Sequence, residues 1–180
     1  MLASPPAMSE PSVGSSRLTV GLAQIDSRLG DLEANLERHL AWIERARAHG
    51  VDLLVFPELS LTGYRLLHLT SRVALTPESP LLARLAEAAR PMTVVAGFVE
   101  ESDRGVLHNS AVLLSGGFFE GGARHIHRKL YLPTYGIFQE ERFFRAGRRL
   151  DRSAREARRE SGRREIRSVE ALRKRDRGLA

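Results

Sequence analysis

Two side chains in this sequence are suited to acid–base and electrostatic chemistry, Glu58 and Lys129. Glu58 follows the apolar run VDLLVF, and reactive groups in open α/β sheets gather where such buried strands end. Pro57 stiffens this segment, and we expect Leu59 and Leu61 to shield the carboxylate partly from water, which would let it take a proton near neutral pH. The alternative interpretation is a solvated loop glutamate, which is the commoner state of an arbitrary Glu.

Lys129 stands out by composition. Residues 1–150 contain sixteen arginines and this single lysine, so the cations of this part of the chain are otherwise supplied by arginine. A lysine presents a compact ammonium that can approach a developing oxyanion from one direction, whereas a guanidinium is a broad planar fork. Chance is the alternative, because a single lysine has to lie somewhere.

The segment after Lys129 is dense in aromatic residues and ends in a charged cluster. It reads LYLPTYGIFQEERFF over residues 130–144 and includes Glu140. Loops of this composition often line small-molecule sites. The alternative is a long loop that packs its own aromatic side chains, with Glu140 and Glu141 serving only as partners of Arg142 or Arg145.

Three weaker candidates have structural interpretations. His125 and His127 share one face of a predicted strand, but no third ligand follows at a spacing typical of a metal site. Asn109 is interpreted as a partner of backbone groups at the start of a strand. The glycine pairs at 116–117 and 121–122 indicate turns, because the phosphate-binding glycine patterns are absent.

The pattern of apolar residues predicts an α/β scaffold for these candidates. Residues 18–23 and 51–56 read as buried strands, and Asp31 can cap a helix over residues 31–48 between them. A right-handed crossover then makes the two strands parallel and puts the helix on one face of the sheet. The further predicted elements are a short helix near residues 66–74, a helix over 80–90, a strand over 92–99, and a hairpin formed by 107–114 and 118–128.

Length and composition limit the class of protein. A chain of 180 residues with 42% hydrophobic residues suits one folded domain. No run approaches the roughly 20 apolar residues that cross a bilayer, and residues 1–16 lack the features of a signal peptide, so we expect a cytoplasmic protein without a membrane partner. The chain has no cysteine, which excludes disulfides, thiolate zinc sites and a thiol nucleophile within it.

The two ends of the chain differ from the body. Residues 1–16, rich in Ser and Pro, are predicted to be a disordered leader. Residues 151–180 carry eleven Lys/Arg and six Asp/Glu and so hold +5 of the net charge of +6. We expect the Arg/Glu-rich tail at 149–180 to lie outside the fold and to add no strand to a sheet. Its interleaved acidic residues and its lack of aromatics also argue against a nucleic-acid partner.

Three segments together resemble the nitrilase superfamily of carbon–nitrogen hydrolases: FPELSLTGY at 56–64, HNSAVLL at 108–114 and HRKLYLPTYGIFQEERFF at 127–144. The resemblance is closest to amidases and to the glutaminase domain of glutamine-dependent NAD synthetases. It implies an α/β fold, a four-layer α-β-β-α sandwich, of which residues 17–148 would supply an incomplete part. It further implies hydrolysis of a small amide or nitrile, no metal or organic cofactor, and homo-oligomers of the full domain.

The resemblance also assigns roles. Glu58 matches the general base, Lys129 the group that stabilises the oxyanion, and Glu140 a second glutamate that orients lysine and substrate. The nucleophilic cysteine that should follow the lysine, in a segment like G-x-x-I-C-E-D, is absent. Ser168 is a poor substitute because an unactivated hydroxyl is far weaker than a thiolate.

The missing nucleophile leaves two interpretations of function. The first is a carbon–nitrogen hydrolase that is inactive as this chain alone, and a change of reading frame after codon 148 would explain the composition of the tail. The alternative is a non-catalytic binding or regulatory module that retains the hydrolase fold.

Overall fold

The computed structural model describes residues 17–115, 124–135 and 139–148 and the backbone of residues 165–173. The predicted leader and the turn of the predicted hairpin, with its glycine pairs, lie outside these ranges. The elements, in chain order, are β1 (Arg17–Gln24), α1 (Leu32–Ala48), β2 (Leu53–Val55), the 3-10 helix η1 (Leu67–Val73), α2 (Pro80–Ala89), β3 (Thr93–Glu101), β4 (Leu107–Ser115), β5 (Arg124–Arg128), the 3-10 helix η2 (Glu140–Arg142) and β6 (Glu165–Arg173).

The predicted strand–helix–strand unit is confirmed at the start of the chain. Strands β1 and β2 pair in parallel, with Val20 opposite Leu53, and α1 connects them. The side chain of Asp31 accepts a hydrogen bond from the backbone N–H of Ala34 at 3.1 Å, which satisfies one of the free donors at the start of α1. The short helix predicted near residues 66–74 is a 3-10 helix rather than an α-helix.

One mixed sheet runs through the described part of the chain, in the order β5-β4-β3-β2-β1-β6. Strand β3 pairs in parallel with β2, and β4 and β5 follow antiparallel, as the hairpin prediction required. The parallel strands β2 and β3 place their carboxyl ends at one edge of the sheet. Within the described ranges, no helix has the length and apolar character of a membrane span.

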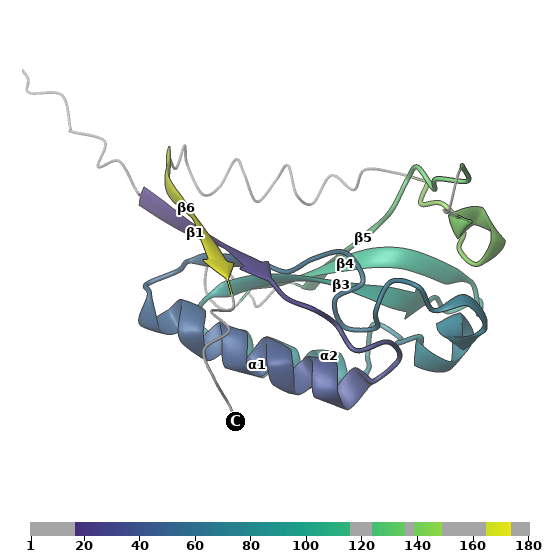
Figure 1. Cartoon of the computed structure of the whole chain (residues 1–180), viewed down its shortest axis with the longest axis horizontal. Helices are drawn as coiled ribbons and strands as arrows, with labels where there is room; N and C mark the ends of the chain where they lie inside the picture. The colour runs from purple at the N-terminus through teal and green to yellow at the C-terminus, as the bar shows by residue number, and fades with distance from the viewer. Residues whose placement is uncertain (1–16, 116–123, 136–138, 149–164, 174–180) are drawn as a thin grey trace, which may run out of the picture.

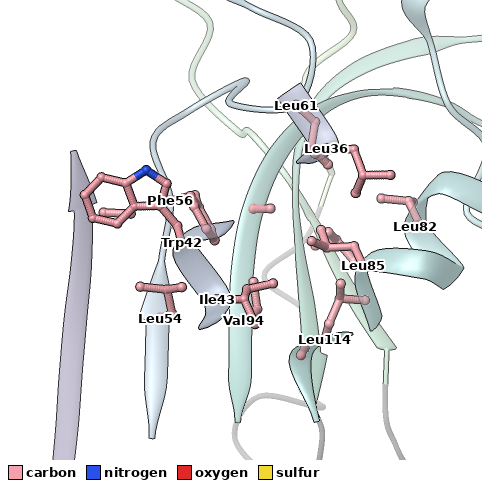
Figure 2. Packing of buried hydrophobic residues seen from close by; sticks show 14 of the residues in the cluster. Leu36, Trp42, Ile43, Leu54, Phe56, Leu61, Leu82, Leu85, Val94 and Leu114 are labelled. Carbon is pink, nitrogen blue, oxygen red and sulfur yellow. The ribbon is translucent and has the colours of Figure 1, made fainter. Parts of the chain in front are cut away.

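Both α-helices lie on one face of the sheet (Figure 1). Figure 2 shows the resulting core, in which helix residues such as Leu36 and Leu85 pack against strand residues such as Leu54 and Val94, all of them fully buried. Burial of each such side chain stabilises the fold by about 1.5–3 kcal/mol. This packing fixes the sheet whose edge carries the candidate site.

The other face of the sheet bears an apolar row that is only partly covered. Leu22, Val55, Val95 and Leu113 lie opposite one another on four neighbouring strands, and their side chains alternate with those facing the helices. Leu22 is 41% exposed and the other three are half-buried. The described residues thus form one helix layer and one sheet layer, which corresponds to part of the four-layer sandwich.

The expectation that the tail adds no strand is wrong. Strand β6 pairs in parallel with β1, from Arg17 opposite Glu165 to Gln24 opposite Arg173, and extends the sheet at that edge. The composition argument concerned side chains that could fill a core, whereas strand pairing uses backbone N–H and C=O groups that almost any sequence carries. The placement of a domain boundary at residue 148 stays a prediction.

Candidate active site

Glu58 lies where the parallel strand β2 ends, as predicted. Past Val55 the chain continues beside β3: the N–H of Phe56 donates to the carbonyl of Val95 at 2.9 Å, and the N–H of Leu61 donates to the carbonyl of Gly97 at 2.9 Å. Between these two contacts the backbone turns at residues 57–60 and projects the Glu58 side chain from the sheet edge. The position of the carboxylate is therefore set by strand pairing rather than by a free loop.

Lys129 follows β5 directly and reaches the same edge from the antiparallel side of the sheet. Its N–H donates to the carbonyl of Asn109 at 2.8 Å, and its carbonyl accepts from the N–H of Gly147 at 2.8 Å. The Lys129 Nζ atom lies 2.7 Å from Glu58 Oε1, although the two residues are 71 positions apart in the sequence. The sheet thus joins the two candidates singled out by their chemistry.

Glu140 completes the cluster from η2. Its side chain is only 7% exposed, and Lys129 Nζ lies 2.9 Å from both of its carboxylate oxygens, of which Oε1 accepts a hydrogen bond with normal geometry. Tyr64 donates its hydroxyl proton to the same Oε1 at 2.6 Å. The structure therefore brings together all three predicted site residues, with Glu140 paired to Lys129 rather than only to a neighbouring arginine; their catalytic roles stay predictions.

The charge state of Lys129 follows from its two carboxylate neighbours. Burial lowers the pKa of Lys129, but the hydrogen bonds to Glu58 and Glu140 outweigh this effect and hold the pKa above its ordinary value. The side chain is thus a fixed ammonium and not a base. An ammonium has three N–H donors. Two are directed at the carboxylates, which leaves one for the oxygen of a ligand.

Glu58 is more open to solvent than the sequence suggested. Its side chain is 44% exposed, because Leu59 and Leu61 are buried in two separate apolar clusters instead of covering the carboxylate. The prediction that Leu59 and Leu61 shield the carboxylate is therefore wrong for the described residues. Its Oε1 accepts from Asn109 Nδ2 at 2.6 Å and from Lys129 Nζ at 2.7 Å, and no described donor reaches Oε2. The second oxygen is the one available to accept a proton.

Sequence reasoning missed two members of the cluster, Asn109 and Tyr64. Asn109 was interpreted as a partner of backbone groups, but its side-chain amide donates to Glu58. Burial raises the pKa of Tyr64, and the hydrogen bond with Glu140 raises it further, so the hydroxyl keeps its proton. Both residues lie within the segments that carried the family resemblance, which was the one signal in the sequence that could have marked them.

The charged cluster stands between two hollows. A cavity of about 440 Å³ is lined by Glu58, Asn109 and Lys129 together with His127 and Tyr131. A second cavity, of about 270 Å³, lies beside Glu140 and is lined mainly by apolar side chains. The cavity of about 440 Å³ falls in the range typical of small-ligand sites. The arrangement offers a cation and two carboxylates to a molecule with both a polarised oxygen and N–H donors.

Two alternatives for neighbouring residues can be compared with the structure. In the described part of the chain, no group of three His, Cys, Asp or Glu residues is placed to hold a metal ion. The loop after Lys129 partly packs its own apolar residues, since Leu132 and Phe144 share one buried cluster. Tyr131 is 87% exposed, so the loop also presents an aromatic side chain to solvent.

The family model for carbon–nitrogen hydrolases matches residues 19–159. The chain belongs to this family. It is 37% identical over 137 residues to the glutamine-dependent NAD(+) synthetase of Thermotoga maritima, and the matched region covers 74% of this chain and 23% of that protein. It is 36% identical over 129 residues to the enzyme of the same name from Xylella fastidiosa, with 71% of this chain and 23% of that protein covered.

Solved structures agree with the family assignment. The glutamine-dependent NAD+ synthetase from Acinetobacter baumannii superposes with a TM-score of 0.59 at 29% identity, covering 72% of this chain and 24% of that one. An amidase from Nesterenkonia sp. superposes with a TM-score of 0.62 at 24% identity, over 76% of this chain and 51% of that one, and supports the fold alone. This chain thus spans about a quarter of the NAD synthetases and about half of the amidase.

Proposed function

We propose that this carbon–nitrogen hydrolase chain binds a small amide at Glu58, Lys129 and Glu140 and, having no cysteine, does not turn it over at an enzymatic rate. The observation that carries the proposal is Lys129 Nζ held at 2.7 Å from one carboxylate and 2.9 Å from the other. A cation fixed in this way suits a developing oxyanion, and a neighbouring carboxylate suits proton transfer.

An amide fits the cluster better than a nitrile. Glu58 Oε2 lies on a side chain that is 44% exposed and has no described donor. An amide brings an oxygen for the remaining N–H of Lys129 and an N–H donor for Glu58, whereas a nitrile brings no donor. The relatives are named glutamine-dependent NAD(+) synthetases, and this name favours a side-chain amide of the glutamine type as the ligand.

The chemistry expected of a complete site explains what this chain lacks. A thiol nucleophile would lose its proton to Glu58 and attack the amide carbon, and Lys129 would stabilise the negative oxygen of the tetrahedral intermediate. This chain has no cysteine to begin that sequence. The backbone of Ser168 lies on β6, opposite Thr19 of β1. In general, an unactivated hydroxyl is a far weaker nucleophile than a thiolate.

The proposal is tested by separating binding from turnover. We expect no ammonia release above background from glutamine, acetamide or propionamide, but amide-dependent shifts of the Glu58 and Lys129 NMR resonances. Lys129→Met should weaken amide binding by at least about tenfold through loss of the oxygen's partner, which corresponds to about 1.4 kcal/mol. Arg84→Met is the matched control, because Arg84 is a half-exposed cation that contacts Glu33 and Glu37.

Two results would overturn parts of the proposal. Rapid ammonia release that Ser168→Ala abolishes would show that a hydroxyl replaces the thiol. Amide binding that is equally strong in Lys129→Met would place the ligand elsewhere. If the Glu58 and Lys129 NMR resonances do not shift at high amide concentration, the result would instead favour the alternative, a non-catalytic module that retains the fold and binds another partner.

A further inference from the structure

The turn that carries Glu58 rests on helix α1 of the first strand–helix–strand unit. Asn35 Nδ2 donates to the carbonyl of Leu61 at 3.0 Å, and the N–H of Gly30 donates to the carbonyl of Thr62 at 2.9 Å. Leu59, next to Glu58, has φ of 50°, a conformation that L-residues rarely adopt unless their surroundings hold them. The backbone beside the carboxylate is therefore kept in place by contacts outside the charged cluster.

His39 of α1 is the buried titratable group beneath this turn. It is fully buried, its ring lies 4.1 Å from that of Phe56, and both of its nitrogens have partners. Nδ1 lies 2.7 Å from the carbonyl oxygen of Asn35, and Nε2 lies 2.9 Å from Ser60 Oγ. None of the contacts of Glu58, Lys129 or Glu140 described above involves this histidine.

The direction of each hydrogen bond follows from the chemistry of the partners. A carbonyl oxygen only accepts, so Nδ1 carries a proton and donates to Asn35. Burial lowers the pKa of His39 to about 4, so the ring is neutral at pH 7 and Nε2 is an acceptor. Ser60 therefore donates its hydroxyl proton to Nε2. Its oxygen in turn accepts from the N–H of Gly97 at 3.3 Å.

These contacts form one ordered chain of hydrogen bonds. It runs from the N–H of Gly97 on β3 through the hydroxyl of Ser60 to Nε2 of His39, and from Nδ1 of His39 to the carbonyl of Asn35 on α1. Ser60 is two residues from Glu58, and the backbone turns between them. A doubly protonated ring, or a ring with its only proton on Nε2, would direct an N–H group at the Ser60 oxygen, which already accepts from the N–H of Gly97. The Ser60 hydroxyl proton would then have no acceptor at Nε2.

We propose that His39 and Ser60 are positioning residues for Glu58: the neutral histidine, protonated on Nδ1, fixes the Ser60 hydroxyl and thereby aims the Glu58 carboxylate at Lys129 and Asn109. Neither residue touches the amide. Their value to catalysis or binding rests on the proposed function, but the hydrogen-bond chain itself does not. The two claims can therefore fail separately.

The tautomer of His39 is measured on the unaltered chain. Long-range ¹H–¹⁵N correlation spectra of the ¹⁵N-labelled protein at pH 7 report which ring nitrogen carries the proton, and the other five histidines serve as internal references. We expect His39 to be protonated on Nδ1 and bare on Nε2. A proton on Nε2 would overturn the proposal without any substitution.

Variants then test whether the chain positions Glu58. Ser60→Ala removes the donor to Nε2 and should therefore move the ¹⁵N resonance of His39 Nε2 and the ¹³C resonance of the Glu58 carboxyl carbon. Ser60→Thr keeps the hydroxyl and should restore both. Ser27→Ala is the matched control, because Ser27 donates to the Ser60 backbone carbonyl at 2.7 Å, and no described hydrogen bond joins it to the Ser60 hydroxyl or the His39 ring; it should leave the His39 Nε2 resonance unchanged.

The outcomes distinguish this inference from the proposed function. Unchanged His39 Nε2 and Glu58 carboxyl resonances in folded Ser60→Ala would show that the contact only fills space, and the positioning role would be refuted. Should both change while no amide binds even to the unaltered chain, the positioning role stands and the proposed function fails. If the amide binds, Ser60→Ala should weaken that binding about tenfold and Ser60→Thr should recover it.

Discussion

Replacing Gly97 by alanine should disturb the Glu58 turn more than the same replacement at Gly21, the other glycine in the described strands. A Cβ atom at this position would lie 2.3 Å from the N atom of Leu59 and 2.9 Å from both the carbonyl carbon of Glu58 and the carbonyl oxygen of Pro57. All three are backbone atoms, so no side chain can rotate away. Either β3 or the turn has to move.

The size of the effect can be worked from these contacts. Forcing a methyl group into a filled site costs about 1–3 kcal/mol. Movement of the turn would also weaken two hydrogen bonds, from Leu61 N–H to the carbonyl of Gly97 and from Gly97 N–H to Ser60 Oγ, each of which contributes about 1 kcal/mol. We therefore expect Gly97→Ala to lower the free energy of unfolding by roughly 3 kcal/mol.

Gly21→Ala is the matched control on β1. Its Cβ would meet side-chain methyl groups of Val51 at 3.1 Å and of Leu54 at 3.2 Å, which can shift slightly, so its cost should stay below about 1.5 kcal/mol. Both substitutions restrict the unfolded chain alike. Urea unfolding followed by circular dichroism gives the two free energies, and equal values would refute the argument from backbone contact.

Two further predictions concern buried charges. Burial raises the pKa of Glu100, but hydrogen bonds from Arg128 and Ser110 outweigh this and hold the pKa low. Glu100 is buried while Arg128 is 41% exposed, so Arg128→Met should lower the free energy of unfolding by about 2–3 kcal/mol, less than the loss of a fully buried pair. Arg84→Met breaks only exposed pairs and should cost at most about 1 kcal/mol in urea unfolding; similar values for the two variants would contradict the role of burial. The pKa of His39 is about 4 in the folded chain and 6.5 ordinarily, so the unfolded chain takes up the proton at a higher pH than the folded chain does. The free energy of unfolding should therefore fall by up to roughly 3 kcal/mol as the pH drops from about 6.5 to 4. His39→Gln should flatten this dependence, and a flat profile of the unaltered chain would contradict the prediction.

Local patterns in the sequence were sufficient for the order of the elements from β1 to β5 and for Glu58 and Lys129, whereas Glu140 was marked by the family resemblance. Apolar periodicity and the Asp31 cap determine α1 because burial of one helix face and the satisfaction of the first N–H groups are local requirements. The continuous run before Pro57 determines a buried strand, and its end marks the place of Glu58. The choice of one lysine among arginines marked Lys129 before any contact was known.

Only the tertiary structure decided which groups meet across the sheet. Asn109 lies 51 residues from Glu58, and Tyr64 lies 76 residues from Glu140, so their contacts depend on strand register and loop path. The exposure of Glu58 was equally inaccessible, because it depends on where the neighbouring leucine side chains point. The sixth strand shows the same limit, since its pairing with β1 uses backbone groups that leave little trace in the residue pattern. The sequence by itself therefore indicated the charged groups of the site, and the sheet determined their partners, Asn109 and Tyr64 among them, and their exposure to water.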